Sequence, residues 1–192
     1  MTMTRQSPMG RLGIALAGLV VCGAALTGCS SKSAIRQGGP LAGDIDPSSH
    51  LIQCVPVPAR GLIVVDGFNT IPNNGQQVAV IDRVALVDPK NLRQLEAWVV
   101  PTRVLYGDWI GYPPNGGHHT PTAGFDWPAR QNAVGARIGQ AAPARPNMNL
   151  LVAAQMSDTS EASEQGIDVW YHVGNHRYHL RTNVTMLDRL HC

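Results

Sequence analysis

The chain has 192 residues, of which 44% are hydrophobic and 15% are charged, and its 15 basic and 13 acidic side chains nearly balance. This length predicts one folded domain with accessory segments. The balanced charge leaves no basic stripe of the kind that nucleic-acid binding requires, so we expect no nucleic-acid partner.

Residues 1–28 predict an export signal peptide. Arg5 and Arg11 give the segment a positively charged start, and Leu12–Leu26 follows as an uncharged apolar run that ends in small residues. The run is shorter than the roughly 20 residues of a membrane-spanning helix, which favours a cleaved signal over a retained membrane anchor. Removing the signal also removes two of the 15 basic residues and leaves 13 basic against 13 acidic side chains.

The signal closes with Leu26–Cys29 (LTGC), which resembles the lipobox of bacterial lipoproteins, in which a small residue precedes a cysteine. The resemblance implies lipid attachment to the Cys29 sulfur, cleavage after Gly28, and anchoring on the extracytoplasmic face of the cell membrane. Residues 29–49 are rich in Ser, Gly and Pro and have no apolar period, so they predict a lipidated, flexible tether. A flexible segment of this length would span about 25 Å.

Residues 50–192 predict an all-β domain, because short β-branched runs are broken by Gly, Pro, Asn and Asp and no long helical period is present. We expect an immunoglobulin-like antiparallel β-sandwich of about seven to nine strands, with a small β-barrel as the alternative. The expected strands are Leu51–Val57, Leu62–Phe68, Gln77–Val87, Leu92–Leu105, Ala133–Ile138, Asn149–Met156, Ile167–Val173 and His176–Val184, with a short last strand at Leu187–His191. The run Gln77–Val87 does not alternate through Asp82-Arg83, which predicts a bulge there.

One hairpin can be predicted in register. Gly174-Asn175 is a two-residue turn, so the residues on either side of it pair outward from Val173 and His176. One face then carries Val169, Tyr171, Val173, Tyr178 and Leu180, and the other carries Asp168, Trp170, His172, Arg177, His179 and Arg181. We expect the first face to join the core and the second to be polar, with Asp168 directly opposite Arg181.

The cysteines predict a disulfide. Cys22 lies in the signal and Cys29 is the expected lipid site, which leaves Cys54 and Cys192 in the folded domain. Two remaining thiols in an exported chain favour a disulfide between them, with two separate thiols as the alternative.

The stretch from Trp98 to Trp127 is the candidate recognition surface. It is rich in Pro and Gly and holds six of the chain's ten aromatic residues. Clustered aromatics on a loop suit a glycan or a protein partner, whereas the alternative is that they plug one end of the sandwich. The candidate ligand or partner residues are Trp109, Tyr112, His118, His119, Phe125 and Trp127.

Metal binding is a second hypothesis. His172 and His179 share the polar hairpin face, and a third ligand from His118, His119 or His191 would complete a Zn or Cu site. Neither an H-E-x-x-H nor a C-x-x-C motif is present, and strand histidines facing solvent are the simpler interpretation. The acidic segment Asp158–Glu164 offers carboxylates for Ca²⁺, but it lacks a calcium-loop pattern and is better explained as a solvated turn.

The sequence therefore favours a membrane-anchored, non-catalytic binding or scaffolding module of the cell envelope that needs no cofactor. A His-based Zn or Cu protein is the first alternative and an enzyme is the second, although neither G-x-S-x-G nor S-x-x-K occurs. The expected partners are the membrane, through the lipid, and an envelope protein or glycan. The NNGQQVAVIDRVALVDP run (Asn73–Pro89) and the YHLRTNV run (Tyr178–Val184) resemble cell-surface lipoproteins of actinobacteria, and this resemblance implies no activity.

Overall fold

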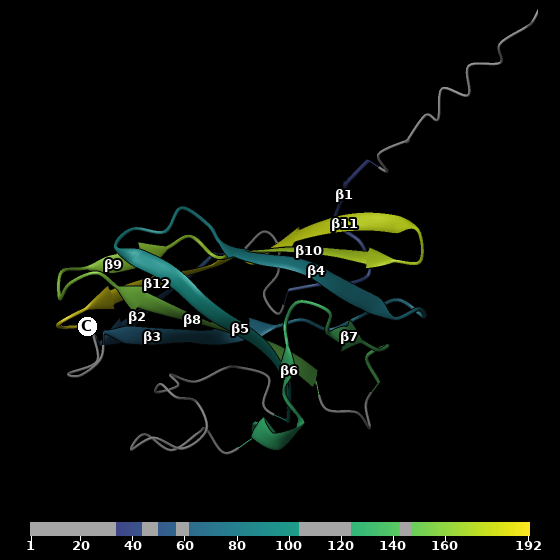
Figure 1. Ribbon diagram of the computed structural model, residues 1–192, viewed down its shortest axis with the longest axis horizontal. Coiled ribbons are helices and arrows are strands. Elements are labelled where there is room, and N and C mark those ends of the chain that lie inside the picture. Colours follow the sequence, from purple (N-terminus) through teal and green to yellow (C-terminus); the bar gives the residue numbers. More distant parts are fainter. Residues whose placement is uncertain (1–33, 44–49, 57–61, 104–123, 143–146) are drawn as a thin grey trace, which may run out of the picture. The chain divides into compact units, whose positions relative to one another are not determined.

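The computed structural model describes residues 34–43, 50–56, 62–103, 124–142 and 147–192, which belong to one compact unit, Ser33–Cys192. In these described residues twelve strands form three sheets, and η1 (Trp127–Ala129) is a short 3-10 turn outside them (Figure 1). The described strands do not close into a barrel, and the prediction of a β-sandwich is confirmed.

The sheets are built mainly from antiparallel neighbours. The five-stranded sheet has the order β1 (Arg36–Gln37), β11 (His176–Arg181), β10 (Ile167–Val173), β4 (Ala79–Leu86) and β7 (Arg137–Ile138). The four-stranded sheet has the order β3 (Ile63–Thr70), β8 (Asn147–Met156), β5 (Leu92–Thr102) and β6 (Gln131–Asn132). The three-stranded sheet has the order β2 (Leu51–Pro56), β12 (Val184–Arg189) and β9 (Ala162–Glu164). Two pairs are parallel, β1 with β11 and β2 with β12.

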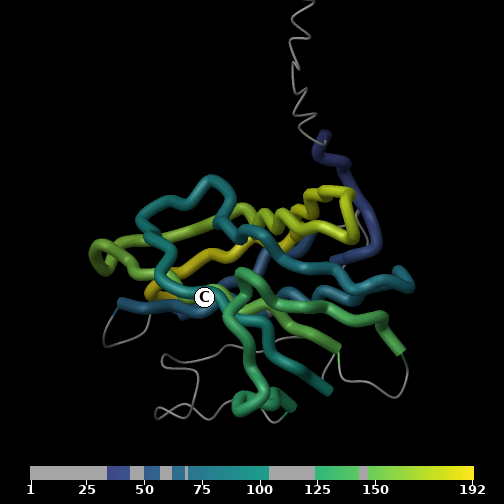
Figure 2. The backbone as a smooth tube through the Cα atoms, turned by 45° about the vertical axis from the view of Figure 1, so that its right-hand side comes forward, coloured from purple at the N-terminus to yellow at the C-terminus, as the bar shows by residue number. Residues whose placement is uncertain are grey.

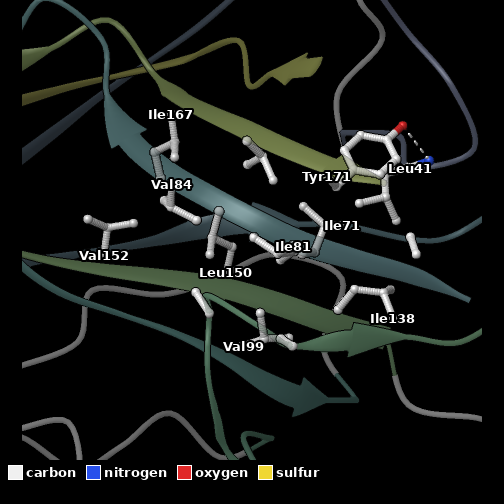
Figure 3. Packing of buried hydrophobic residues seen from close by; sticks show 14 of the residues in the cluster. Leu41, Ile71, Ile81, Val84, Val99, Ile138, Leu150, Val152, Ile167 and Tyr171 are labelled. Carbon is white, nitrogen blue, oxygen red and sulfur yellow. Dashed lines mark hydrogen bonds between the residues drawn. The ribbon is translucent and has the colours of Figure 1, made fainter. Parts of the chain in front are cut away.

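The main core lies between the five-stranded and four-stranded sheets (Figure 3). Alternate residues of β4 and β10 meet alternate residues of β5 and β8, as the period of two in a strand requires. Its largest side chain is Tyr171, which is fully buried and whose hydroxyl accepts a hydrogen bond of 3.2 Å from the Leu41 N–H. The core also includes Ile71, Ile81, Val84, Val99, Ile138, Leu150, Val152, Ile167 and Val169.

The predicted hairpin register is confirmed, because β10 and β11 pair Val173 with His176 and continue to Asp168 opposite Arg181. The predicted bulge is also present. Trp170 pairs with Arg83 but Tyr171 pairs with Ile81, so Asp82 is the extra residue of β4. The bulge turns Asp82 to the same face as His172, with which it forms a hydrogen bond.

The prediction of a flexible tether over residues 29–49 is wrong for the segment around β1. Figure 2 shows this segment, in purple, running beside the yellow β11. Leu41 is only 2% exposed and belongs to the main core, and a side chain at Gly39 would collide with Tyr171 and Tyr178. A single leucine among glycines and prolines produces no apolar period, which explains why the pattern pointed to a tether.

The predicted disulfide is present between Cys54 in β2 and Cys192 at the end of the chain, with 5.7 Å between the two Cα atoms. The disulfide links the last residue to β2, which pairs in parallel with β12, and the two cysteines are 138 positions apart in the sequence. In the predicted strand Ala133–Ile138, residues 133–136 instead form a turn after β6, and only Arg137–Ile138 form a strand, β7. The last strand is β12, which begins three residues earlier than predicted and ends at Arg189.

Candidate functional site

The residues of the predicted recognition surface divide into two groups. Trp109, Tyr112, His118 and His119 lie outside the described residues. Phe125 and Trp127 are described, and both are partly buried against a second apolar cluster that consists of Val65, Val100, Leu151 and Ala153. Val100 on β5 and Leu151 and Ala153 on β8 alternate with the main-core residues Val99, Leu150 and Val152, so this second cluster lies on the opposite face of the four-stranded sheet.

Trp127 has a defined place on this outer face. Its ring meets Trp98 edge-on with 5.5 Å between the ring centroids, and the Arg130 guanidinium lies 4.6 Å from its centroid. The tryptophan therefore covers apolar sheet surface while part of it stays exposed, so it serves packing at the same time as it remains available to a partner.

The predicted histidine pair does lie on one face, but each ring is engaged by a carboxylate. His172 Nδ1 lies 2.8 Å from Asp82 Oδ1, and His179 Nε2 lies 2.7 Å from Asp168 Oδ1. The second nitrogen of His179 lies 3.1 Å from the side-chain oxygen of Gln37 in β1. Within the described ranges, no three His, Cys, Asp or Glu side chains form a group suited to hold a metal ion.

Trp170 is at the centre of this face. Its cross-strand neighbours are Arg83 on β4 and His179 on β11, because the register places all three side by side. The Arg83 guanidinium lies 4.5 Å from the centre of the indole, and the His179 ring stacks on the indole at 5.1 Å with an interplanar angle of 28°. The three side chains form an ordered layer that holds one cation directly over an aromatic ring.

One end of the layer is fixed by an ion pair. Arg181 donates from Nε and Nη2 to the two oxygens of Asp168, each at 2.8 Å, in a bidentate arrangement. Burial alone would raise the pKa of Asp168, but the hydrogen bonds from Arg181 and His179 outweigh it and hold this pKa below the usual range. Asp168 therefore stays ionised and keeps the His179 ring oriented toward Trp170.

Beside the layer lies a shallow depression of about 360 Å³. It is lined by Ile35, Asp82, Arg83, Trp170, Tyr171, Arg177 and Tyr178. Ile35 is 54% exposed, which places an apolar side chain next to two arginines. The sequence placed Trp170 and Arg177 on the polar face of the hairpin but did not identify them as site residues. It gave no sign of Arg83 and Ile35, because these reach the depression only through the pairing of β4 and β1 with the hairpin.

Three carboxyls are buried elsewhere, between strands of the other two sheets. Asp66 on β3, Glu164 on β9 and Asp188 on β12 are 5%, 2% and 1% exposed. Burial, reinforced by the charges of Asp66 and Asp188 and by a hydrogen bond with Asp66, raises the pKa of Glu164 to about 10. Burial and the charge of Asp66 raise the pKa of Asp188 to about 7. The expectation of a solvated turn at Asp158–Glu164 is thus wrong for its last three residues, which form β9 and include the buried Ala162 and Glu164.

The fold and the site define a disulfide-closed β-sandwich that carries a layered cationic and aromatic face on one sheet. No protein-family profile, curated protein or solved structure matches the chain. In the part of the chain that the structure describes, no helix is both long and apolar enough to cross a membrane.

Proposed function

We propose that the chain is a lipid-anchored extracytoplasmic protein whose sandwich acts as a non-catalytic binding module of the cell envelope. The observation that carries the binding role is the Arg83–Trp170–His179 layer beside the depression. A cation held on an indole, next to an exposed aliphatic side chain, is a preformed surface for a partner that carries both negative charge and apolar atoms.

Two observations support export and anchoring. The LTGC sequence that ends at Cys29 has the pattern of a lipidation signal. The Cys54–Cys192 disulfide fits an oxidising compartment, because disulfides are rare in proteins that stay in the reducing cytosol.

Several of the described ionisable groups are held in fixed pairs or are buried, which suits a rigid binding surface. On the five-stranded sheet His172, His179 and Arg181 are engaged by Asp82 or Asp168. The carboxyls with strongly raised pKa, Glu164 and Asp188, are buried and closed to a substrate.

The anchoring is tested with Cys29→Ser, and with Cys22→Ser as the matched control inside the signal. We expect labelled palmitate to be incorporated into the wild type and the Cys22→Ser variant and to be lost from Cys29→Ser, which stays unprocessed. A Cys29→Ser protein that is still cleaved and lipid-labelled would contradict the proposal.

The binding role is tested by placing the photo-crosslinker benzoylphenylalanine at position 177, beside the depression, or at position 93 on β5 as the control. We expect irradiation of growing cells to give discrete adducts from position 177 and not from position 93. Equal adducts from both positions, or none from position 177, would count against this face as the binding site.

A further inference from the structure

Few residues of the sequence separate the expected lipid site from the first strand of the sheet. Arg36 pairs with Tyr178 and Gln37 pairs with His179, so Ile35 lies level with Arg177 where β1 begins. Five residues, Ser30–Ala34, separate Ile35 from Cys29. Whatever conformation they adopt, the dimensions of the backbone limit their span to about 20 Å. A lipid on Cys29 would therefore hold this end of the sheet close to the headgroups.

This end of the sheet carries a concentration of positive charge. The start of β1, the start of β4, the tip of the β10–β11 hairpin and β7 all lie on the right in Figure 1. Ile35, Arg36, Val78, Arg137 and Arg177 are exposed at this end, and the exposed Arg83 follows in the middle of β4, opposite Trp170; we call these six residues the basic end. In the described parts of these strands the acidic residues are Asp82, which is paired with His172, and Asp168, which is held by Arg181 toward the other end.

From this placement we infer that the basic end docks onto the anionic lipid headgroups of the membrane in which Cys29 is anchored. The inference rests on the proposed lipid anchor and names the partner of the candidate face. Four arginines face the negative surface potential of the lipid, while Ile35 and Val78, which are 54% and 38% exposed, reach the apolar boundary beneath the headgroups. The domain then lies with this edge on the membrane.

Charge and distance favour headgroups over a distant glycan or protein. The field of an anionic membrane decays over about 8 Å at physiological ionic strength, and the link to Cys29 keeps Ile35, which is next to Arg36 at the start of β1, within roughly 20 Å of the anchor. Each arginine near an anionic surface strengthens binding by roughly fivefold. Several arginines on one rigid edge therefore suffice to hold an already anchored domain in one orientation.

The test uses the lipidated mature protein, reconstituted into vesicles of phosphatidylglycerol or of phosphatidylcholine. Exposed arginines are modified with phenylglyoxal and the modification of each is followed by peptide mass spectrometry. We expect Arg83 and Arg177 to react about fivefold more slowly on phosphatidylglycerol than on phosphatidylcholine. Arg93, which is exposed on β5 of the other sheet, should react equally on both, and salt should remove the difference.

A matched pair of variants isolates the role of the basic end. In the Arg83→Gln/Arg177→Gln protein, the protection of Arg36 and Arg137 on phosphatidylglycerol should disappear. In the Arg93→Gln/Arg103→Gln protein, which loses the same charge from the four-stranded sheet, this protection should remain.

The outcomes separate this inference from the proposed anchor. If the N-terminal peptide carries lipid but the arginines of the basic end react equally on both lipids, the docking is overturned and the anchor stands. Protection that also occurs without vesicles and grows with protein concentration would show self-association and overturn the docking. If Cys29 carries no lipid, both proposals fall.

Discussion

Replacement of the buried Glu164 by glutamine tests the electrostatics of the sandwich most directly. The pKa of Glu164 is raised to about 10 in the folded protein, chiefly by burial, from an unfolded value of about 4.5. The folded chain therefore keeps a proton that the unfolded chain has released. The contribution of Glu164 to the unfolding free energy is fully present below about pH 4.5 and is lost as the pH rises through the range up to about 10.

The size of this loss follows from the pKa shift. Each pH unit inside the window costs about 1.4 kcal/mol of unfolding free energy, so between pH 5 and pH 8 Glu164 alone costs about 4 kcal/mol. Asp188 adds to the loss up to pH 7, because its pKa is raised to about 7. The whole stability of a domain is roughly 5–15 kcal/mol, so this change is large.

Urea unfolding at several pH values between 5 and 8 measures the effect. The Glu164→Gln protein should match the wild type at pH 5 and exceed it by about 4 kcal/mol at pH 8, since the amide stays neutral and still offers a hydrogen bond to Asp66. The control Glu161→Gln, at an exposed residue three positions earlier, should retain the wild-type slope. A wild-type stability that is flat or rises from pH 5 to pH 8 would refute the reasoning, and so would an unchanged slope in Glu164→Gln.

Three further predictions concern packing and the disulfide. Leu41→Ala should lower the unfolding free energy by about 3 kcal/mol because Leu41 is buried, whereas Leu190→Ala, at a residue that is 66% exposed, should not; equal melting temperatures for the two would contradict the burial of Leu41. The Cys54→Ser/Cys192→Ser protein should lose about 4 kcal/mol in urea melts, and reductant should have the same effect on the wild type alone. Trp127→Ala should lower stability by about 2 kcal/mol, since its ring packs on Trp98, and an unchanged thermal melt would leave recognition as its main role.

Local patterns predicted the parts of the fold that local chemistry determines. The two-residue turn Gly174-Asn175 fixed the register of β10 and β11, and the broken alternation at Asp82-Arg83 located the bulge of β4. The disulfide was predictable from the number of cysteines together with the expectation of export, because after Cys29 the chain has two cysteines.

Features that depend on distant pairing were not predictable. The parallel pairing of β2 with β12 joins segments at the two ends of the domain, and nothing in either strand specifies the other. The burial of Leu41 depends on Tyr171, 130 residues away. The sequence does contain one sign of the buried carboxyls. Asp66 lies inside the expected strand Leu62–Phe68, whose β-branched residues predict burial. The candidate face was predictable only in its hairpin half, since Arg83 and Ile35 arrive from other strands.

The two groups of acidic residues act on stability in opposite directions as the pH changes. Asp168 has a lowered pKa, so its pairs with Arg181 and His179 stabilise the fold above the unfolded pKa near 3.8 and weaken as the pH falls below it. Glu164 and Asp188 have raised pKa values and destabilise the fold as the pH rises above their unfolded values. The pH range over which Asp168 changes the unfolding free energy lies below the ranges of Glu164 and Asp188. The three carboxyls together therefore make the fold most stable in mildly acidic solution. Asp168 stays ionised throughout the pH range in which the buried carboxyls lower stability, so in the folded protein its ion pair with Arg181 persists there.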